Sequence, residues 1–439
     1  MKHRLAPIVA AVVGLALAAS AAPAFAAPVP APVPAPTAGA PAPGEDSGPA
    51  SGPASGPAEP FLAPEPTESA EPADQAGRAA AGQRRKALAA LTEAGAVSAI
   101  AEIRDRGGVW RGASGVADLA TGSPVRADGR FRAGSVTKVL VATTVLQLVG
   151  ERRVGLDDSV EKHLPGLVPN GAGITVRQLL NHTSGLWDPT NESDGIFPEL
   201  FDPAVFRAWV ADGGLQRTVT ARRLVAVSAA HPPYFPPGAE WRYSNTNYAL
   251  LGLLIEKATG REYGQEVTRR ILGPLGMAGS LFPGTASAIP GPHAHGYWTI
   301  VDEAGPVRKT YVDVTEHNPS WAGAAGELIS TTDDLARFER ALLGGRLLPP
   351  WLMREMTSTV QTDPGSHELD YGLGLARYQL SCGPVLGHNG GIFGYDTQLW
   401  GTADRQVALS YTGRGDEKDE AAQLAAMKGF LETAFCGGR

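Results

Sequence analysis

Short apolar runs that favour β-strands lie at both ends of the folded part of the chain. Residues 97–102 and 109–116 bracket the turn Asp105-Arg106-Gly107-Gly108, a pattern that predicts a β-hairpin. Residues 395–402 and 407–412 bracket residues 403–406 in the same way. After this second hairpin, apolar residues recur at helical spacing, which predicts a terminal helix with one face formed by Leu424, Met427, Phe430, Leu431 and Phe435.

The stretch between the hairpins, roughly residues 150–350, has mainly helical patterning. Strands from both ends of the chain are therefore expected to meet in one antiparallel sheet flanked by helices, with a mainly helical lobe beside it. This is an α/β arrangement of two lobes, and ligand sites tend to lie in the cleft between lobes.

The first 82 residues do not share this patterning. Basic residues at 2–4, an apolar segment to about residue 22 and the small residues of Ala24-Phe25-Ala26 predict a secretory signal peptide over residues 1–26. An uncleaved membrane anchor is the weaker interpretation, because Pro7, Gly14 and Pro23 interrupt the apolar segment. Residues 27–82 are rich in Pro, Ala, Gly, Ser and Glu and are expected to form a disordered or extended linker, which leaves residues 83–439 for the folded domain.

Composition narrows the class of protein further. The formal net charge of −7 comes without a basic stripe, which argues against nucleic acid as a partner. No later apolar run approaches the ~18 residues of a membrane-spanning helix, so we expect a secreted, extracellular or cell-wall-associated monomer without a membrane segment. His293 and His295 have no third metal ligand nearby, so neither a metal nor a cofactor is expected.

The chain contains two cysteines, Cys382 and Cys436. In an exported protein such a pair favours one disulfide, and metal binding by two isolated cysteines is the weaker alternative. We therefore expect no free thiol.

The pattern Ser-x-x-Lys occurs twice, at Ser135–Lys138 and at Ser159–Lys162. The first copy opens a stretch that is apolar on nearly every face, which is typical of a buried central helix. Ser135 then lies in the first turn, near the free N–H groups of the helix end, and Lys138 projects from the same face. Burial lowers the pKa of a lysine, which suits Lys138 to take a proton from Ser135. The second copy follows two aspartates and is interpreted as a solvated helix start.

Two further motifs carry groups that acyl transfer needs. Tyr243 and Asn245 precede another apolar helix, and they can pass a proton to a leaving group and hold a substrate amide. A core aromatic and a helix N-cap are the structural alternatives. His388-Asn389-Gly390 lies in a run with four glycines between 387 and 394, which lets a substrate backbone approach closely. The sequence has no Gly-x-Ser-x-Gly, so the nucleophile elbow of α/β-hydrolases is excluded.

Taken in order, Ser135-Val136-Thr137-Lys138, Tyr243-Ser244-Asn245 and His388-Asn389-Gly390 resemble the three signatures of the penicillin-recognising serine hydrolases. The likeness is greatest to the secreted D-alanyl-D-alanine carboxypeptidases of actinomycetes, which are related to class C β-lactamases, and it runs from about residue 88 to 439. It implies a serine β-lactamase/DD-peptidase-like fold and an acyl-enzyme intermediate. It also implies D-Ala-D-Ala peptides or related small acyl substrates, β-lactams as inhibitors, and a bridge between Cys382 and Cys436.

The resemblance implies a role for each matching residue. Ser135 would be the nucleophile, and Lys138 and Tyr243 would share the acid and base work, with the base for acylation left open. Asn245 would bind the substrate amide, and His388 would position Tyr243 and the substrate carboxylate. The backbone N–H groups of Ser135 and Gly391 would form the oxyanion hole. The remaining substrate-binding residues would be Asn389, Gly390 and Gly391 on the glycine-rich run, together with Trp321. Trp321 matches an aromatic wall of the family's pocket, and a core tryptophan is the structural alternative. His182 is expected to be structural.

Three positions depart from the carboxypeptidase pattern, and all three concern specificity. Ala376 stands where these enzymes carry an arginine that grips the terminal carboxylate, and Arg377 comes one position later, which on a strand faces the other side. Asn389 and Gly391 replace two threonines. An esterase, a D-amino-acid amidase or a D-aminopeptidase is therefore a serious alternative to a carboxypeptidase. A β-lactamase is less favoured because His388 stands where those enzymes usually carry lysine, and a non-catalytic wall-binding or penicillin-sensing module is the alternative from a different class.

Overall fold

The computed structural model describes residues 72–437, apart from 202, 303–307, 364–365, 367 and 414–416. The predicted signal peptide and residues 27–71 of the predicted linker lie outside the described residues. The main element is an antiparallel sheet whose eight described strands follow the order β2-β1-β12-β11-β10-β9-β8-β7.

The strands of this sheet are β1 (Ser98–Asp105), β2 (Gly108–Gly115), β7 (Val360–Gln361), β8 (Leu369–Tyr371), β9 (Ala376–Leu380), β10 (Gly383–Ile392), β11 (Tyr395–Gly401) and β12 (Gln406–Thr412). Two short pairs lie outside it, β3 (Phe131–Arg132) with β6 (Ile329–Ser330), and β4 (Tyr297–Asp302) with β5 (Arg308–Asp313). The helices are α1 (Pro72–Glu93), α2 (Thr137–Gly150), α3 (Val160–His163), α4 (Val176–Leu180), α5 (Pro203–Ala211), α6 (Ala221–Ala229), α7 (Asn245–Thr259), α8 (Tyr263–Val267), α9 (Gly273–Leu275), α10 (Thr332–Leu343), α11 (Pro350–Thr357) and α12 (Glu417–Cys436).

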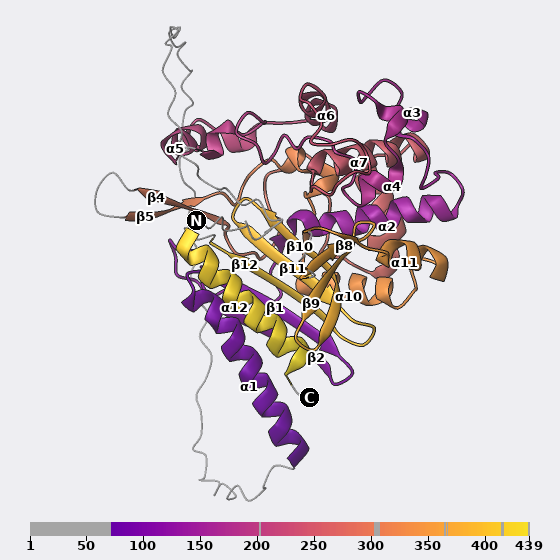
Figure 1. The fold of residues 1–439 in the computed structure, drawn as a ribbon. Helices are drawn as coiled ribbons and strands as arrows, with labels where there is room; N and C mark the ends of the chain where they lie inside the picture. The colour runs from indigo at the N-terminus through magenta and orange to yellow at the C-terminus, as the bar shows by residue number, and fades with distance from the viewer. Residues whose placement is uncertain are drawn as a thin grey trace, which may run out of the picture. The chain divides into compact units, whose positions relative to one another are not determined.

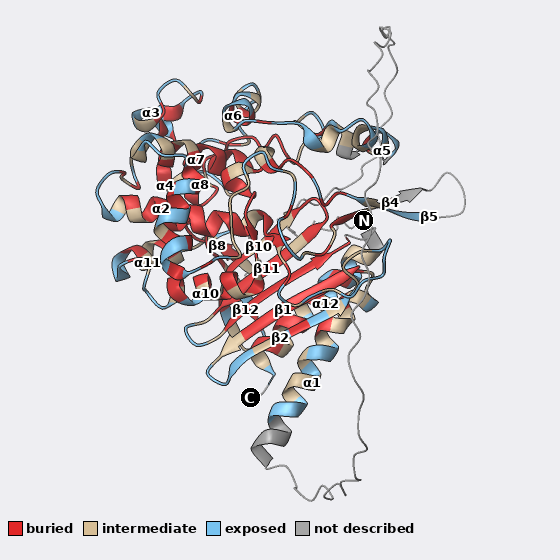
Figure 2. Cartoon of the chain, turned by 180° about the vertical axis from the view of Figure 1, so that it is seen from behind, coloured by how far each residue is buried: buried red, intermediate tan, exposed pale blue. Residues whose placement is uncertain are grey.

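Each face of the sheet is covered by helices. Side chains alternate between faces along a strand, so Val407 and Leu409 of β12 pack toward α1 and α12, whereas Ala408 packs toward the helical lobe. Figure 1 shows α1 and α12 together on one side of the strands and α2, α7 and α11 in the helical lobe. In Figure 2 the central strands are buried along most of their length, as expected for a sheet covered on both sides.

The prediction of a sheet built from both ends of the chain is confirmed. β1 of the first hairpin pairs antiparallel with β12 of the second, with Ile100 opposite Ser410. The middle of the chain is mainly helical as predicted, and the hairpin β4–β5 is an element that the apolar pattern did not reveal.

Two details of the prediction are wrong. Leu424 does not lie on the buried face of α12, because it is 36% exposed, and Gln423 takes the inward position and donates to the carbonyl of Gly413 at 3.0 Å. The expected boundary between linker and domain at residues 82 and 83 falls inside α1. Residues 72–82 are helical because Ala, Gln and Arg, which are good helix formers, follow Pro72.

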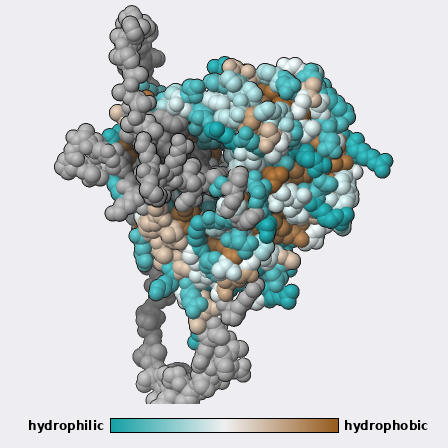
Figure 3. All heavy atoms as spheres, in the orientation of Figure 1, coloured by the Kyte–Doolittle hydropathy of each residue, from teal (hydrophilic) through white to brown (hydrophobic). Residues whose placement is uncertain are grey.

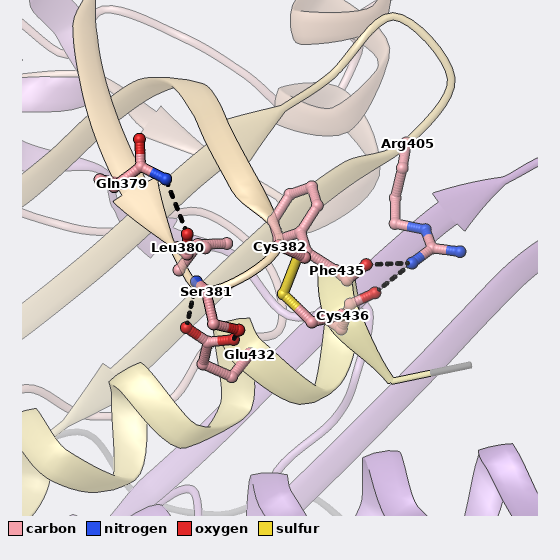
Figure 4. Close-up of a disulfide and its surroundings, with 9 residues drawn as sticks. Gln379, Leu380, Ser381, Cys382, Arg405, Glu432, Phe435 and Cys436 are labelled. Atoms are coloured by element: carbon pink, nitrogen blue, oxygen red, sulfur yellow. Dashed lines mark hydrogen bonds between the residues drawn. A yellow bond between two sulfur atoms is a disulfide. The ribbon is translucent and has the colours of Figure 1, made fainter. Parts of the chain in front are cut away.

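The structure contains the bridge between Cys382 and Cys436 that the sequence implied, with a Cα–Cα distance of 5.6 Å. Figure 4 shows that it ties the turn between β9 and β10 to the end of α12. Ser381, beside Cys382, bonds to Glu432 of α12, and Arg405 donates to the carbonyls of Ala434 and Phe435. Together these contacts fix the terminal helix to the sheet.

In the view of Figure 3, hydrophobic residues form separate patches among hydrophilic ones on the surface. The large apolar side chains exposed in the described part of the chain come from different elements and are Val109, Leu119, Val205, Tyr311, Trp351 and Leu424. None of the helices within residues 72–437 has the length and hydrophobicity to span a bilayer.

Candidate active site

Ser135 lies in a 3₁₀ turn, η1 (Gly134–Val136), between β3 and the buried helix α2. Gly134 has φ +53°, a left-handed conformation that glycine adopts readily and that sharpens the turn. In α2 the residues from Thr137 to Leu146 are all buried, as the apolar pattern predicted. The serine therefore sits at the start of a rigid central helix.

The glycines of β10 bring a second backbone against this turn. A Cβ on Gly390 would lie 2.2 Å from the carbonyl oxygen of Ala133 and 2.9 Å from the backbone nitrogen of Ser135. A Cβ on Gly134 would similarly lie 2.8 Å from the carbonyl oxygen of Gly391. Beyond Gly387, β10 pairs within the sheet with β11 but no longer with β9. The other edge of β10 therefore faces Ser135. The N–H groups of Ser135 and Gly391 are thus brought into one region.

Lys138 reaches back from the first turn of α2 to the serine. Its Nζ lies 3.0 Å from Ser135 Oγ, 2.8 Å from Asn245 Oδ1 and 2.6 Å from the carbonyl oxygen of Ala325. The side chain is completely buried. Burial holds the pKa of Lys138 well below its usual value, with Asp188 opposing this effect. A neutral amine can donate to the Asn245 and Ala325 oxygens and still offer its lone pair to the Ser135 hydroxyl.

Tyr243 lies next to the side chain of Lys138. The lysine Nζ is 4.9 Å from the centre of the Tyr243 ring, and no described residue reaches the buried Tyr243 hydroxyl with normal hydrogen-bond geometry. Burial raises the pKa of Tyr243 well above its usual value, with the neighbouring Ser135 hydroxyl opposing the rise. The phenol therefore stays protonated and is equipped to give a proton rather than to take one.

His182 holds the ring of Tyr243 in place. The two rings stack with centroids 4.2 Å apart. His182 Nδ1 accepts from the backbone N–H of Ser244 at 3.2 Å and faces Asn247 Nδ2 at 3.0 Å, so its neutral form is favoured. Burial also lowers the pKa of His182. A φ of +61°, rare for a residue other than glycine, fits a residue fixed by its surroundings. The structural role expected for His182 agrees with this position.

The side-chain amide of Asn245 forms its hydrogen bonds with other groups of the protein. Its Oδ1 faces Lys138, and its Nδ2 donates to Asp188 Oδ2 at 3.2 Å and to Thr190 Oγ1 at 2.8 Å. An amide nitrogen has two hydrogen atoms, and here each has an acceptor. The resemblance implied that Asn245 binds a substrate amide. In this structure Asn245 has no side-chain N–H left to donate to a substrate.

His388 lies near Tyr243 but bonds to a different tyrosine. Its Nε2 is 2.8 Å from the hydroxyl of Tyr371, and its Nδ1 faces the carbonyl of Asn389. The centre of its ring lies 6.4 Å from that of Tyr243. Burial lowers the pKa of His388 to about 3, with Lys138 adding to the effect, so the ring is neutral at physiological pH. Nδ1 then carries the hydrogen, and Tyr371 donates to Nε2.

Trp321 belongs to an aromatic cluster beside the end of β10. Its ring centroid lies 5.0 Å from that of Phe197 and 5.2 Å from that of Phe393, which directly follows β10. The side chain is half-buried. Its ring packs against two hydrophobic clusters, which agrees with the alternative of a core tryptophan.

The carboxylate grip of the carboxypeptidase pattern is missing. Ala376 is 1% exposed and lies opposite Gly387 in a regular antiparallel pair, so an arginine there would need repacking of the core. Arg377 pairs with Asp370 at 3.2 Å. Because the register from residue 376 to residue 380 is regular, no bulge turns Arg377 toward the serine.

The second Ser-x-x-Lys has no such surroundings. Ser159 is the N-cap of α3 and accepts from the backbone N–H of Lys162 at 3.3 Å. Lys162 is exposed and pairs with Asp158 at 2.6 Å. The interpretation of this copy as a solvated helix start is confirmed. No group of three or more metal-ligating side chains was found among residues 72–437 outside the omitted positions.

Sequence reasoning missed three residues that contact this cluster, namely Asp188, Thr190 and Tyr371. Asp188 and Thr190 follow Trp187 in a segment without helical or strand periodicity, so nothing marked them. Tyr371 begins the run Tyr-Gly-Leu-Gly-Leu, which directly precedes Ala376, and no feature of that run indicates a contact with His388. The signal that the sequence offered for Asp188 is an acidic residue between Trp187 and Pro189, a short distance after His182.

The chain is similar in sequence and in fold to several known proteins. A solved D-stereospecific amidohydrolase from Streptomyces sp. is 42% identical, with a TM-score of 0.70 over 82% of this chain and 99% of that chain. A D-amino acid amidase from Ochrobactrum anthropi, solved with D-phenylalanine, is 28% identical, with a TM-score of 0.70 over 82% of this chain and all of that one. Penicillin-binding protein 4* of Bacillus subtilis is 27% identical over 70% of this chain and 66% of its own length.

The chain spans between 47% and 66% of the length of its first three curated relatives. Residues 79–432, most of the chain, match the Beta-lactamase family. The fold expected from the resemblance, a β-lactamase/DD-peptidase-like sheet flanked by helices, is confirmed by the solved neighbours. The chain belongs to the Beta-lactamase family and has the fold of its solved neighbours.

Proposed function

We propose that this protein is a serine amidohydrolase that cleaves amides of D-amino acids through an acyl-enzyme on Ser135. The observation that carries the acyl-transfer chemistry is the 3.0 Å approach of a buried lysine amine to Ser135 Oγ. The substrate class is supported by the similarity to the Streptomyces amidohydrolase and by the missing carboxylate grip at Ala376 and Arg377.

In acylation, the neutral amine of Lys138 takes the Ser135 proton as Oγ attacks the scissile carbonyl carbon. The oxygen of that carbonyl becomes negative and is stabilised by the backbone N–H groups of Ser135 and Gly391, which β10 brings together. When the C–N bond breaks, Tyr243 gives its proton to the leaving amine and recovers one from the Lys138 ammonium. Ammonia or an amine leaves, and the acyl group remains on Ser135.

In deacylation, water attacks the ester carbonyl and gives its proton to Lys138 through Tyr243. The second tetrahedral intermediate breaks the bond to Ser135 Oγ, which takes back a proton, and the free D-amino acid is released. The pKa directions favour Lys138 as the base for acylation, since burial makes the amine neutral and keeps the phenol protonated. His388, bonded to Tyr371, is proposed to support the Tyr243 side of the pocket, and Trp321 to border the substrate side chain.

The hydrogen bonds of Asn245 also support a substrate with a free amino group. Penicillins and acylated peptides present an acylamino carbonyl next to the scissile bond, and an asparagine with a free N–H binds it. Here both Nδ2 hydrogens are donated to Asp188 and Thr190, so that carbonyl would gain no bond from Asn245. An amide of an unacylated D-amino acid has no such carbonyl to satisfy.

A D-Ala-D-Ala carboxypeptidase is the second candidate, because a penicillin-binding protein is among the relatives. A panel of four substrates separates the two: D-phenylalaninamide, L-phenylalaninamide, N-acetyl-D-phenylalaninamide and an N-acyl-D-Ala-D-Ala peptide. We expect the unacylated D-amide to have the highest kcat/KM and the L-amide to be inert. A preference for the acyl-D-Ala-D-Ala peptide would establish the carboxypeptidase instead.

The same panel is run on Ser135→Ala and on Ser159→Ala as the matched control. Only the Ser135 variant should lose turnover and the acyl adduct seen by intact-mass analysis after incubation with penicillin or substrate. Turnover or labelling that persists in Ser135→Ala would refute the nucleophile.

A further inference from the structure

Asp188 is a fully buried acid that the mechanism above does not use. It lies in the segment after α4, and it is the charged group closest in the hydrogen-bond network to Asn245 and Lys138. Its two oxygens accept two hydrogen bonds from Thr190, two from Asn245 and one from Asn191, at 2.7 to 3.2 Å. So many donors favour the ionised form and oppose the effect of burial, which raises the pKa of Asp188.

We propose that Asp188 is a positioning residue that, together with Thr190, fixes the side-chain amide of Asn245 with its oxygen on Lys138. The proposal rests on the acyl transfer at Ser135 proposed above. It gives Asn245 a task other than substrate binding, namely to hold the base against its nucleophile.

The chemistry of the three partners allows one orientation of the amide. A carboxylate only accepts hydrogen bonds, so Asp188 requires the Nδ2 side of Asn245. The remaining side, Oδ1, then lies 2.8 Å from Lys138 Nζ. If the amide rotated by half a turn, its oxygen would face the Asp188 carboxylate and its N–H groups would face the lysine. Thr190 Oγ1 accepts the second Nδ2 hydrogen at 2.8 Å and donates to Asp188 Oδ1 at 2.8 Å, which closes the network.

Asp188 has an electrostatic effect as well. The other titratable groups around Lys138 are His182, His388, Tyr243 and Tyr248, and the pKa of each is shifted by burial toward its neutral form. Asp188 is thus the carboxylate that offsets part of the burial effect on Lys138. Because a negative charge favours the ammonium, loss of this charge should lower the pKa of Lys138 further.

The test uses p-nitrophenyl acetate, an activated ester whose turnover needs the nucleophile and its base but no D-amino-acid recognition. kcat and kcat/KM are measured from about pH 5 to about pH 10, a range that brackets an acid limb set by a lysine of lowered pKa. The variants are Asp188→Asn, which removes the charge at nearly constant shape, Thr190→Val, which removes a hydroxyl at nearly constant shape, and Thr190→Ser, which restores it. Thermal unfolding shows whether each variant is folded.

We expect the acid limb of kcat/KM in Asp188→Asn to move to lower pH by about one unit, since Lys138 then loses its proton more readily. We also expect kcat to fall about tenfold, because an asparagine at 188 can present N–H or C=O and no longer specifies the amide orientation. Thr190→Val should lower kcat several-fold without moving the acid limb, and Thr190→Ser should recover it.

A folded Asp188→Asn with an unmoved acid limb would overturn the proposal, as would a Thr190→Val with wild-type kcat. If Asp188→Asn does not fold, the Thr190 pair alone decides. The outcome is separable from the proposed function in two ways. D-Amide hydrolysis can be absent while these shifts with p-nitrophenyl acetate are present, which would remove the substrate class only. Wild-type ester turnover in Ser135→Ala would instead remove the acyl-transfer site itself.

Discussion

Gly390→Ala is the substitution whose effect follows most directly from the structure. The added Cβ would lie 2.2 Å from the carbonyl oxygen of Ala133 and 2.9 Å from the backbone nitrogen of Ser135. Carbon–oxygen contacts normally begin at about 3.3 Å, so β10 and the serine turn must separate by roughly 1 Å. Both atoms belong to backbone, so no side chain can rotate away to make room.

This separation acts on the region where the N–H groups of Ser135 and Gly391 meet. Loss of one oxyanion donor costs about 10²–10³ in kcat, and a misplacement of about 1 Å can cost about 10². We therefore expect Gly390→Ala to lower kcat by about 10² or more on the best amide substrate. Overpacking should also reduce the free energy of unfolding by about 1–3 kcal/mol.

Gly429→Ala is the matched control. Gly429 lies on the exposed face of α12, and a Cβ there would meet no atom within 4 Å. Alanine in a helix interior is favoured over glycine by about 1 kcal/mol, so this variant should keep full activity and melt slightly higher. Steady-state kinetics and thermal unfolding of both variants check the contrast. Wild-type kcat in a folded Gly390→Ala would show that the close approach of β10 to the serine does not form the oxyanion site.

Lys138→Arg should lose about 10²–10⁴ in kcat/KM at every accessible pH, because a guanidinium cannot give up its proton to become a base; a pH profile with an intact plateau would contradict this. Arg377→Ala should change the ratio of kcat/KM for a free D-Ala-D-Ala acid to that for its C-terminal amide by less than about twofold, because Arg377 is held by Asp370. A loss of kcat/KM on the acid alone would mean that Arg377 reaches the substrate. The double variant Cys382→Ser, Cys436→Ser removes a cross-link between residues that are 54 positions apart. It should lower the free energy of unfolding, measured by denaturant titration, by about 4 kcal/mol with little change in kcat. An unchanged denaturation midpoint would show that the bridge adds no stability.

Much of the fold follows from local sequence. The turn at residues 105–108 and the apolar runs beside it specify a hairpin, and the long continuous apolar stretch after Ser135 specifies a helix buried on all sides, because turn residues and runs of apolar residues are local features of the sequence. The choice between the two Ser-x-x-Lys copies was also available in advance, since one lies in apolar sequence and the other beside aspartates. Leu424 shows the limit of this reasoning, because a helical period does not say which of two neighbouring residues faces the sheet.

The site needed tertiary structure for a different reason. Ser135, Asn245 and Ala325 are far apart in sequence, and their meeting at Lys138 Nζ is set by the packing of α2, α7 and the turn before β6. The sequence named Asn245 but assigned its N–H groups to a substrate, whereas the fold gives them to Asp188 and Thr190. It named His388 but not its partner, Tyr371. Hydrogen bonds between distant buried residues leave no period along the chain, so sequence identifies the chemically capable side chains, and only the three-dimensional packing decides which of their atoms are already occupied.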